Sequence, residues 1–183
     1  MKAKMFLLSA ALLCASHSAC AVEPEATEQS VTNEQSVATE PPVTKAQVLE
    51  AIAVLQTNAA SDAGVKASYK IVRFAQESHT VTVRLNPDTV PWADAKLLKS
   101  EDAVRRLLLA AYIGGSAKAQ LTTPQKAVDD PYEGWRLAID VYRQIQQLKP
   151  YVVLREIDAL EEKQTAGELK HYATEIQNKK PTP

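Results

Sequence analysis

The sequence predicts an all-α fold, a compact bundle of five to six helices, from three observations. Glycine is sparse, with 5 in 183 residues, so the chain lacks the frequent turn signals of an all-β protein. It contains no Asn-Gly or Asp-Gly dipeptide, the strongest short-range signal for a β-hairpin. Its long segments repeat apolar residues at intervals of three and four, which is typical of helices with one buried face.

The first segment, residues 1–21, is expected to lie outside this bundle because it has the parts of a secretory signal peptide. Two lysines precede an apolar run over 5–15, which is too short to span a bilayer. Ala19 and Ala21 then supply the small residues that signal peptidase requires. We therefore expect cleavage near Ala21 and a periplasmic or secreted protein.

A lipoprotein signal is the alternative interpretation, with Cys20 as the lipidated residue. Ser18 suits it, whereas His17 occupies a position that normally carries an aliphatic side chain. Both cysteines of the chain lie in its first 20 residues. Cleavage after Ala21 would therefore leave a mature chain with no disulfide and no thiolate ligand for a metal.

Residues 22–43 are predicted to be a disordered acidic linker. They contain five glutamates, no Lys or Arg, and no Leu, Ile or aromatic residue. Such a segment cannot bury enough apolar surface to offset its chain entropy. The remaining domain, 44–183, carries 19 basic and 17 acidic residues. The whole chain has a formal net charge of −1, and this near-neutral total argues against a nucleic-acid partner. No apolar run is long enough for a transmembrane segment.

Two helices are expected at the start of this domain, over 44–58 and 62–77. Thr44 can cap the former, and Ser61 or Asp62 the latter. Each helix has one apolar stripe with helical spacing. The stripes consist of Val48, Ala51, Ile52 and Leu55 in the first helix and Ala67, Ile71, Phe74 and Ala75 in the second.

Residues 79–86 are ambiguous because apolar and polar residues alternate there, which favours a strand. A lone strand needs a partner, however, and 151–154 is a weak candidate for one. Ser78 can instead cap a short helix. For this reason we favour a helix over 79–86.

The next helix is expected over 101–120, capped by Ser100. It carries no charge from 107 to 117, and a helix that is apolar on all sides should be buried, so we expect it at the centre of the bundle. Gly114 and Gly115 reduce helix propensity. They either allow another helix to approach closely or break this one.

A fourth long helix is predicted over 131–149, with Asp130 as N-cap, Pro131 at the first position and Glu133 in a capping box. Pro150 should end it. Charged and polar side chains of alternating sign recur at helical spacing along one face. They are Glu133, Arg136, Asp140, Arg143 and Gln147.

Two shorter helices are expected to complete the domain, over 153–163 and 166–177. Leu and Ile residues of the former should face inward. Thr165 and Glu168 have the spacing of a capping box for the latter.

No motif predicts catalytic, cofactor-binding or metal-binding residues. His79 and His171, which lie beyond the signal, are far apart, and no zinc motif, glycine-rich phosphate loop or nucleophile motif occurs. Asp129 and Asp130 are best explained as a loop acid and a helix cap rather than as a carboxylate pair for catalysis.

Aromatic residues provide the remaining candidates for a binding surface. Trp92 lies between proline-marked turns, and Tyr132 and Trp135 lie in the first turns of the helix over 131–149. Tryptophan and tyrosine are frequent interface anchors. The alternative is that these rings close one end of the core.

The function expected is that of an exported, non-catalytic helical protein that binds another envelope protein, such as an adaptor or an inhibitor or immunity protein. Export, a compact helical body and the lack of catalytic motifs favour this class. The alternatives are a small exported hydrolase and a carrier of an apolar small molecule around the uncharged helix.

Overall fold

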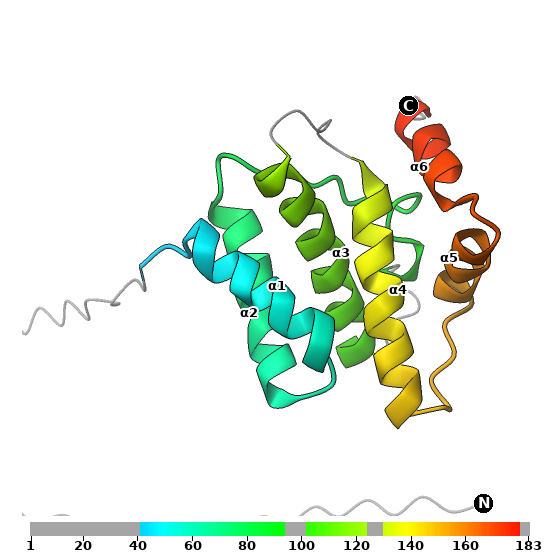
Figure 1. Ribbon diagram of the computed structural model, residues 1–183, viewed down its shortest axis with the longest axis horizontal. Helices are drawn as coiled ribbons and strands as arrows, with labels where there is room; N and C mark the ends of the chain where they lie inside the picture. Colours follow the sequence, from blue (N-terminus) through cyan, green and yellow to red (C-terminus); the bar gives the residue numbers. More distant parts are fainter. Residues whose placement is uncertain (1–40, 94–101, 124–129, 180–183) are drawn as a thin grey trace, which may run out of the picture. The chain divides into compact units, whose positions relative to one another are not determined.

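The computed structural model describes residues 41–93, 102–123 and 130–179, and these residues confirm the all-α prediction (Figure 1). The predicted signal peptide and the linker up to residue 40 lie outside this part of the chain. Within the described ranges there is no strand. The helices are α1 (Lys45–Asn58), α2 (Asp62–Glu77), the short 3-10 helix η1 (Pro91–Ala93), α3 (Asp102–Thr122), α4 (Pro131–Leu148), α5 (Arg155–Thr165) and α6 (Leu169–Asn178).

Helix α3 lies at the centre of the bundle, as its uncharged segment predicted. It packs against α1, α2 and α4, while α5 and α6 lie against α4 (Figure 1). Every residue from 107 to 117 is buried except Leu109, which is half-buried. Apolar residues on all sides of this helix are therefore covered by its neighbours.

The first turns of α1, α2 and α4 are stabilised by the caps that the sequence predicted. Thr44 accepts a hydrogen bond from the Gln47 backbone, and the Gln47 side chain accepts one from the Thr44 backbone, which forms a capping box. The side chains of Ser61 and Asp130 each accept a backbone N–H of the first turn of α2 and α4. These bonds pair N–H groups that have no partner within the helix.

The prediction of a helix over 79–86 is wrong, since this segment is neither helix nor strand. The side-chain amide of Gln120 on α3 takes the place of a neighbouring strand. Its Oε1 accepts from the Thr82 backbone N–H (3.1 Å) and its Nε2 donates to the Thr82 carbonyl (2.8 Å). Val81 is buried and Val83 half-buried. The segment is therefore held to the core by side chains rather than by a backbone ladder.

Helix α3 continues through its two consecutive glycines without a break. A Cβ on Gly115 would lie 2.2 Å from the Glu133 carbonyl oxygen, and one on Gly134 would lie 2.6 Å from Cδ2 of Tyr112. Both distances are far shorter than any van der Waals contact. The glycines therefore allow α3 and α4 to cross with their backbones in direct contact.

The predicted capping box of Thr165 and Glu168 is absent, because α5 continues to Thr165 and α6 begins without a side-chain cap. Gly167 has a φ of 76°, in the left-handed region that glycine favours. Its N–H donates to the Gln164 carbonyl (3.1 Å), and the Glu168 N–H donates to the Lys163 carbonyl (2.8 Å). These two bonds form a Schellman motif that ends α5.

Candidate functional site

The two tryptophans of the predicted binding surface are fully buried, each with an exposed fraction of 0%. Trp135 Nε1 donates to the Thr89 carbonyl at 2.7 Å. Trp92 contacts Tyr112 edge to face, with ring centroids 6.2 Å apart. Both indoles thus hold the segment before α3 against the core, which corresponds to the alternative interpretation of these residues.

Tyr132, the third residue of that predicted surface, is half-buried on α4. The guanidinium carbon of Arg136 lies 5.7 Å from the centroid of its ring. The structure therefore does not bring the three aromatic side chains together on one exposed face.

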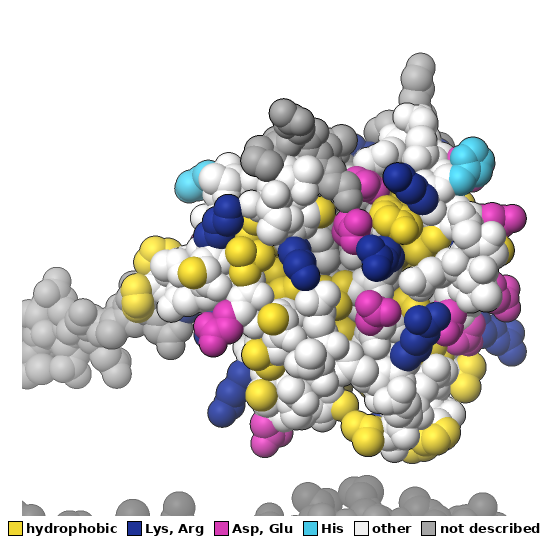
Figure 2. Space-filling model, in the orientation of Figure 1, with side chains coloured by type: hydrophobic (Ala, Val, Ile, Leu, Met, Phe, Trp, Pro, Cys, Tyr) yellow, Lys and Arg dark blue, Asp and Glu magenta, His cyan; other side chains and the backbone are white. Residues whose placement is uncertain are grey.

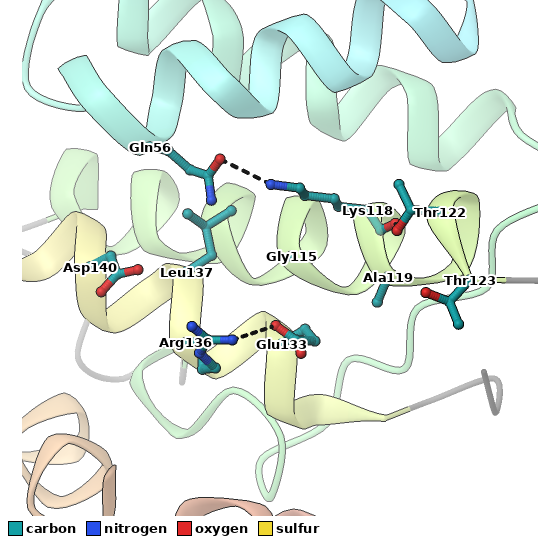
Figure 3. A pocket seen from close by; sticks show the side chains of 10 residues that line it. All are labelled: Gln56, Gly115, Lys118, Ala119, Thr122, Thr123, Glu133, Arg136, Leu137 and Asp140. Carbon is teal, nitrogen blue, oxygen red and sulfur yellow. Dashed lines mark hydrogen bonds and ion pairs between the residues drawn. The ribbon is translucent and has the colours of Figure 1, made fainter. Parts of the chain in front are cut away.

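A polar cleft of about 290 Å³ lies beside the α3–α4 crossing, with walls from α1, α3 and α4 (Figure 3). Lys118 Nζ donates to Gln56 Oε1 at 3.2 Å, and Arg136 pairs with Glu133 at 3.3 Å. The second carboxylate of the cleft, Asp140, lies 3.9 Å from Arg143. Basic and acidic side chains are interspersed on this face (Figure 2). The acids that line the cleft are thus neutralised by arginines of their own helix.

A larger groove of about 670 Å³ is lined by α2, the first half of α3 and the end of α4. Its walls are mainly apolar, unlike those of the polar cleft. We call it the apolar groove. The side chains that give it this character include Val65, Tyr69 and Val72 from α2, Val104 and Leu107 from α3, and Leu148 from α4.

Three large hydrophobic side chains of the apolar groove are strongly exposed. The exposed fraction is 70% for Tyr69, 70% for Leu148 and 43% for Val65. Concentrated exposure of this kind leaves apolar surface in contact with water and is typical of interaction sites. We therefore take the apolar groove as the candidate functional site.

Helix α2 supplies one wall of the groove because it has two apolar stripes. Ala67, Ile71 and Phe74 face the core and are buried. Val65, Tyr69 and Val72 recur at i, i+4 and i+7 on its flank, where they line the groove. The buried face predicted for this helix comprised only the first stripe, although the spacing of the second is visible in the same sequence.

The charged residues of the groove are all basic among the described residues that line it. They are Arg73 of α2, Arg106 of α3 and Lys149, which directly follows α4. Arg73 Nε also pairs with Glu77 Oε1 at 2.8 Å, and this hydrogen bond lowers the pKa of the Glu77 carboxyl. Glu77 itself does not line the groove, but its carboxylate offsets the charge of Arg73.

Comparisons of the chain with models of protein families, with curated proteins and with solved structures found no match. Within the described ranges, no group of three or more His, Cys, Asp or Glu side chains could hold a metal ion. No helix in this part of the chain is long and apolar enough to cross a membrane. The physical properties of the apolar groove are therefore the basis for a functional proposal.

Proposed function

We propose that this chain is an exported, non-catalytic helical protein that binds a protein partner by accepting an amphipathic helix of that partner in the apolar groove. The observation that carries the proposal is the concentration of exposed Tyr69, Leu148 and Val65 around one apolar site. Covering these side chains would remove apolar surface from water, which is the main driving force for association.

The dimensions of the groove favour a helix as its occupant. The α2 wall extends from Val65 to Gln76, which is about 16 Å along a helix axis. A partner helix would present about three turns over this length. Recognition of helices in grooves uses apolar anchors at i, i+3 or i+4, and i+7, and a wall of this length accommodates such a set.

Export is part of the proposal because residues 1–21 have the composition of a signal peptide. The partner would then be another periplasmic or secreted protein. An envelope adaptor and an inhibitor or immunity protein are the two roles that best fit a helical domain whose proposed site is a groove for a helix.

A carrier of an apolar small molecule is the second candidate function. Its support is the volume of the groove, about 670 Å³, which lies within the usual range for small-molecule sites. The groove is also formed in part by the uncharged segment of α3. A hydrolase has less support, because the two carboxylates of the polar cleft, Glu133 and Asp140, each lie beside an arginine.

Selection of peptides on the full chain tests the proposed function. A displayed library of random peptides of about 18 residues, five helical turns, should yield binders with helically spaced apolar anchors. Binding should fall at least about tenfold in a variant with Tyr69→Ser and Leu148→Ser. Peptides that bind this variant as tightly as the original chain would contradict the proposal.

The chain contains a matched control for this variant. Tyr151 and Val153 are 77% and 58% exposed and do not line the groove. Their replacement by serine should leave peptide binding unchanged. Exposed substitutions of both kinds should alter the free energy of unfolding by no more than about 0.5 kcal/mol. The carrier function is favoured if no peptide is selected, dodecanoate binds saturably to the original chain, and the groove variant abolishes that binding.

A further inference from the structure

We infer that the loop between α4 and α5 attaches the protein to the surface of a bilayer that contains anionic phospholipids. This loop consists of residues 149–154, and we call its side chains Tyr151 and Val153 the apolar tip. Neither side chain lines the apolar groove. The inference therefore concerns a second surface and does not depend on the proposed function.

The apolar tip is exposed although the loop around it is partly buried. Tyr151 is 77% exposed and Val153 is 58% exposed, whereas Val152 and Leu154 are 2% and 1% exposed. Side chains of the loop thus alternate between the core and water, as they do along an extended backbone. Tyr151 and Val153 do not belong to the hydrophobic core or to the side chains packed against it, so folding does not require them to be apolar.

Hydrogen bonds to α4 hold the loop in place. The Leu154 N–H donates to Tyr142 Oη at 2.8 Å, and Gln146 Nε2 donates to the Val152 carbonyl at 3.3 Å. The Val152 N–H also donates to the Lys149 carbonyl at 3.0 Å. The loop lies where α4 ends, and hydrophobic side chains are visible along that edge of the molecule (Figures 1 and 2). The tip is therefore presented to a ligand without a large cost of ordering.

Basic side chains flank the apolar tip on both sides. Lys149 and Arg155 are exposed, and neither forms an ion pair within the described ranges. The segment 141–155 contains no Asp or Glu. The next acid, Glu156, lies 3.8 Å from the buried Arg105. Two cations beside an apolar tip complement a surface that is anionic and has an apolar interior.

A protein partner is a poorer match for the tip because the tip is small. A stable protein interface covers about 800 Å² on each partner, whereas a tyrosine buries about 150–250 Å². A bilayer accepts a protruding apolar group without a surface of complementary shape. Tyrosine is also enriched at the headgroup level of membranes. These properties favour a bilayer over a second protein.

The apolar and the basic side chains have separate roles in this attachment. Tyr151 and Val153 would enter the boundary between headgroups and acyl chains, while Lys149 and Arg155 contact lipid phosphates. Binding of this kind increases with the buried apolar area and with attraction to anionic lipids. A basic side chain close to an anionic surface contributes about fivefold in affinity. Loss of either set should therefore weaken binding.

Flotation of the full chain with two kinds of vesicle tests the inference. One kind is equimolar phosphatidylcholine and phosphatidylglycerol, and the other is phosphatidylcholine alone. We expect binding to the anionic vesicles to be at least about tenfold tighter, because each of the two bases contributes about fivefold. Equal binding to both kinds, or flotation with neither, would overturn the inference.

Substitution of the tip tests its role in binding to the anionic vesicles. Tyr151→Ser with Val153→Ser should weaken binding at least about tenfold, because apolar burial is lost. The urea midpoint of unfolding should not change, since both sites are exposed. Leu85→Ser, at a site that is 49% exposed on another loop, is the control and should bind as the original chain does. Undiminished binding by the tip variant would contradict the inference.

A second pair of variants tests the flanking bases. Lys149→Gln with Arg155→Gln should lose most of the preference for anionic vesicles. Lys45→Gln with Lys170→Gln removes the same charge from exposed sites on α1 and α6 and should keep the preference. A preference that survives the first pair of substitutions would show that the flanking bases do not cause it, and the inference would fail.

A fluorescent label at the tip gives a local measurement, which is needed because the apolar run of residues 1–21 is a second possible source of vesicle binding. Tyr151→Trp serves this purpose, since both native tryptophans are fully buried. Its emission should shift to the blue on anionic vesicles and should be quenched by brominated lipid. Leu85→Trp should show neither effect. Flotation without any change at position 151 would overturn the inference.

Two further outcomes would assign the tip to a different ligand. Inorganic phosphate should displace the chain from vesicles no more than chloride does at the same ionic strength. Displacement that is specific to phosphate would indicate a site for a free anion. Self-association in the ultracentrifuge that Tyr151→Ser with Val153→Ser abolishes would indicate a contact between copies of the chain. Either result would overturn the inference.

Discussion

The indole ring of Trp135 on α4 stacks on the phenol ring of Tyr172 on α6, with centroids 5.3 Å apart and planes inclined by 20°. Lys163 Nζ lies 4.6 Å from the centroid of the Tyr172 ring. Apart from these contacts, α6 buries Leu169 and Ala173 and packs the half-buried Ile176 against the core. The stack is therefore a principal anchor of the last helix.

Tyr172→Ala should release α6 from the bundle. We expect the free energy of unfolding to fall by about 1–2 kcal/mol, because the stack contributes beyond the area it buries. Hydrogen exchange should accelerate in α6 while α1 to α4 stay protected, and the near-ultraviolet circular dichroism of Trp135 should change. Tyr151→Ala, at a site that is 77% exposed, is the control. Equal effects of the two substitutions would show that the stack does not anchor α6.

Gly115→Ala should destabilise the protein, although alanine is the better helix former by about 1 kcal/mol. The added Cβ would lie 2.2 Å from the Glu133 carbonyl oxygen, so α3 and α4 must separate, at a cost of about 3 kcal/mol. Urea unfolding measures the change. Gly114→Ala is the matched control, because its Cβ would meet the side chains of Ile52 and Ile71 at 3.3 and 3.4 Å and should cost less. A stabilising Gly115→Ala would contradict the backbone contact.

Tyr142 should make stability fall at alkaline pH. Burial raises its pKa from 10.0 to about 12, the Leu154 N–H bond opposes this shift, and the hydrogen bond to Asp158 supports it. Between these two values the unfolded phenol loses its proton while the folded one keeps it. The stabilisation is therefore complete below pH 10 and is lost as pH rises towards 12, at roughly 1 kcal/mol per pH unit.

Urea unfolding at a series of pH values, with phenolate absorbance, measures this effect. Tyr142→Phe should remove the slope that Tyr142 contributes between pH 10 and 12. It should also cost about 1–2 kcal/mol at neutral pH, since the Leu154 N–H loses its acceptor. Tyr69→Phe, at an exposed site, should leave the slope unchanged. An identical slope in both variants would rule out Tyr142 as its source.

Gly167→Ala should destabilise the turn between α5 and α6 through the backbone alone. A Cβ there meets no atom within 4 Å, whereas the φ of 76° is unfavourable for alanine. We expect a loss of about 1 kcal/mol in urea unfolding. Gly167→Asn should cost less, because asparagine tolerates this conformation better. A neutral Gly167→Ala would mean that the Schellman motif does not require glycine.

The start of a helix was predicted correctly where residues of the same turn determine it. Thr44, Ser61 and Asp130 bind backbone groups within three residues, so their roles are visible locally. The segment 79–86 was mispredicted because Gln120, which binds the Thr82 backbone, lies 38 residues away. No local pattern reveals such a partner.

The prediction for the junction of α5 and α6 was wrong for a different reason. Thr165 and Glu168 have the spacing of a cap that starts a helix, while Gly167 between them is suited to end one. Both rules apply to the same four residues. Gly167 adopts the left-handed conformation, which allows its N–H and that of Glu168 to pair two carbonyls at the end of α5.

The candidate site was only partly accessible to sequence reasoning. A preference for aromatic anchors selected Trp92 and Trp135, but residue type does not reveal whether an indole is exposed or lies in the core. The stripe of Val65, Tyr69 and Val72 could have been recognised from its spacing. That this stripe lies beside Leu148, at the end of α4, is visible only in the folded structure.

The contact of Gly115 with α4 also fixes where α4 meets the apolar groove, although neither Gly115 nor Gly134 lines it. Leu148 follows Gly134 by 14 residues on one helix, a distance of about 21 Å. A slip of one helical turn at the crossing would displace Leu148 by about 5.4 Å along α3. Two hydrogen atoms in place of side chains therefore determine where Leu148 lies along the wall of the groove.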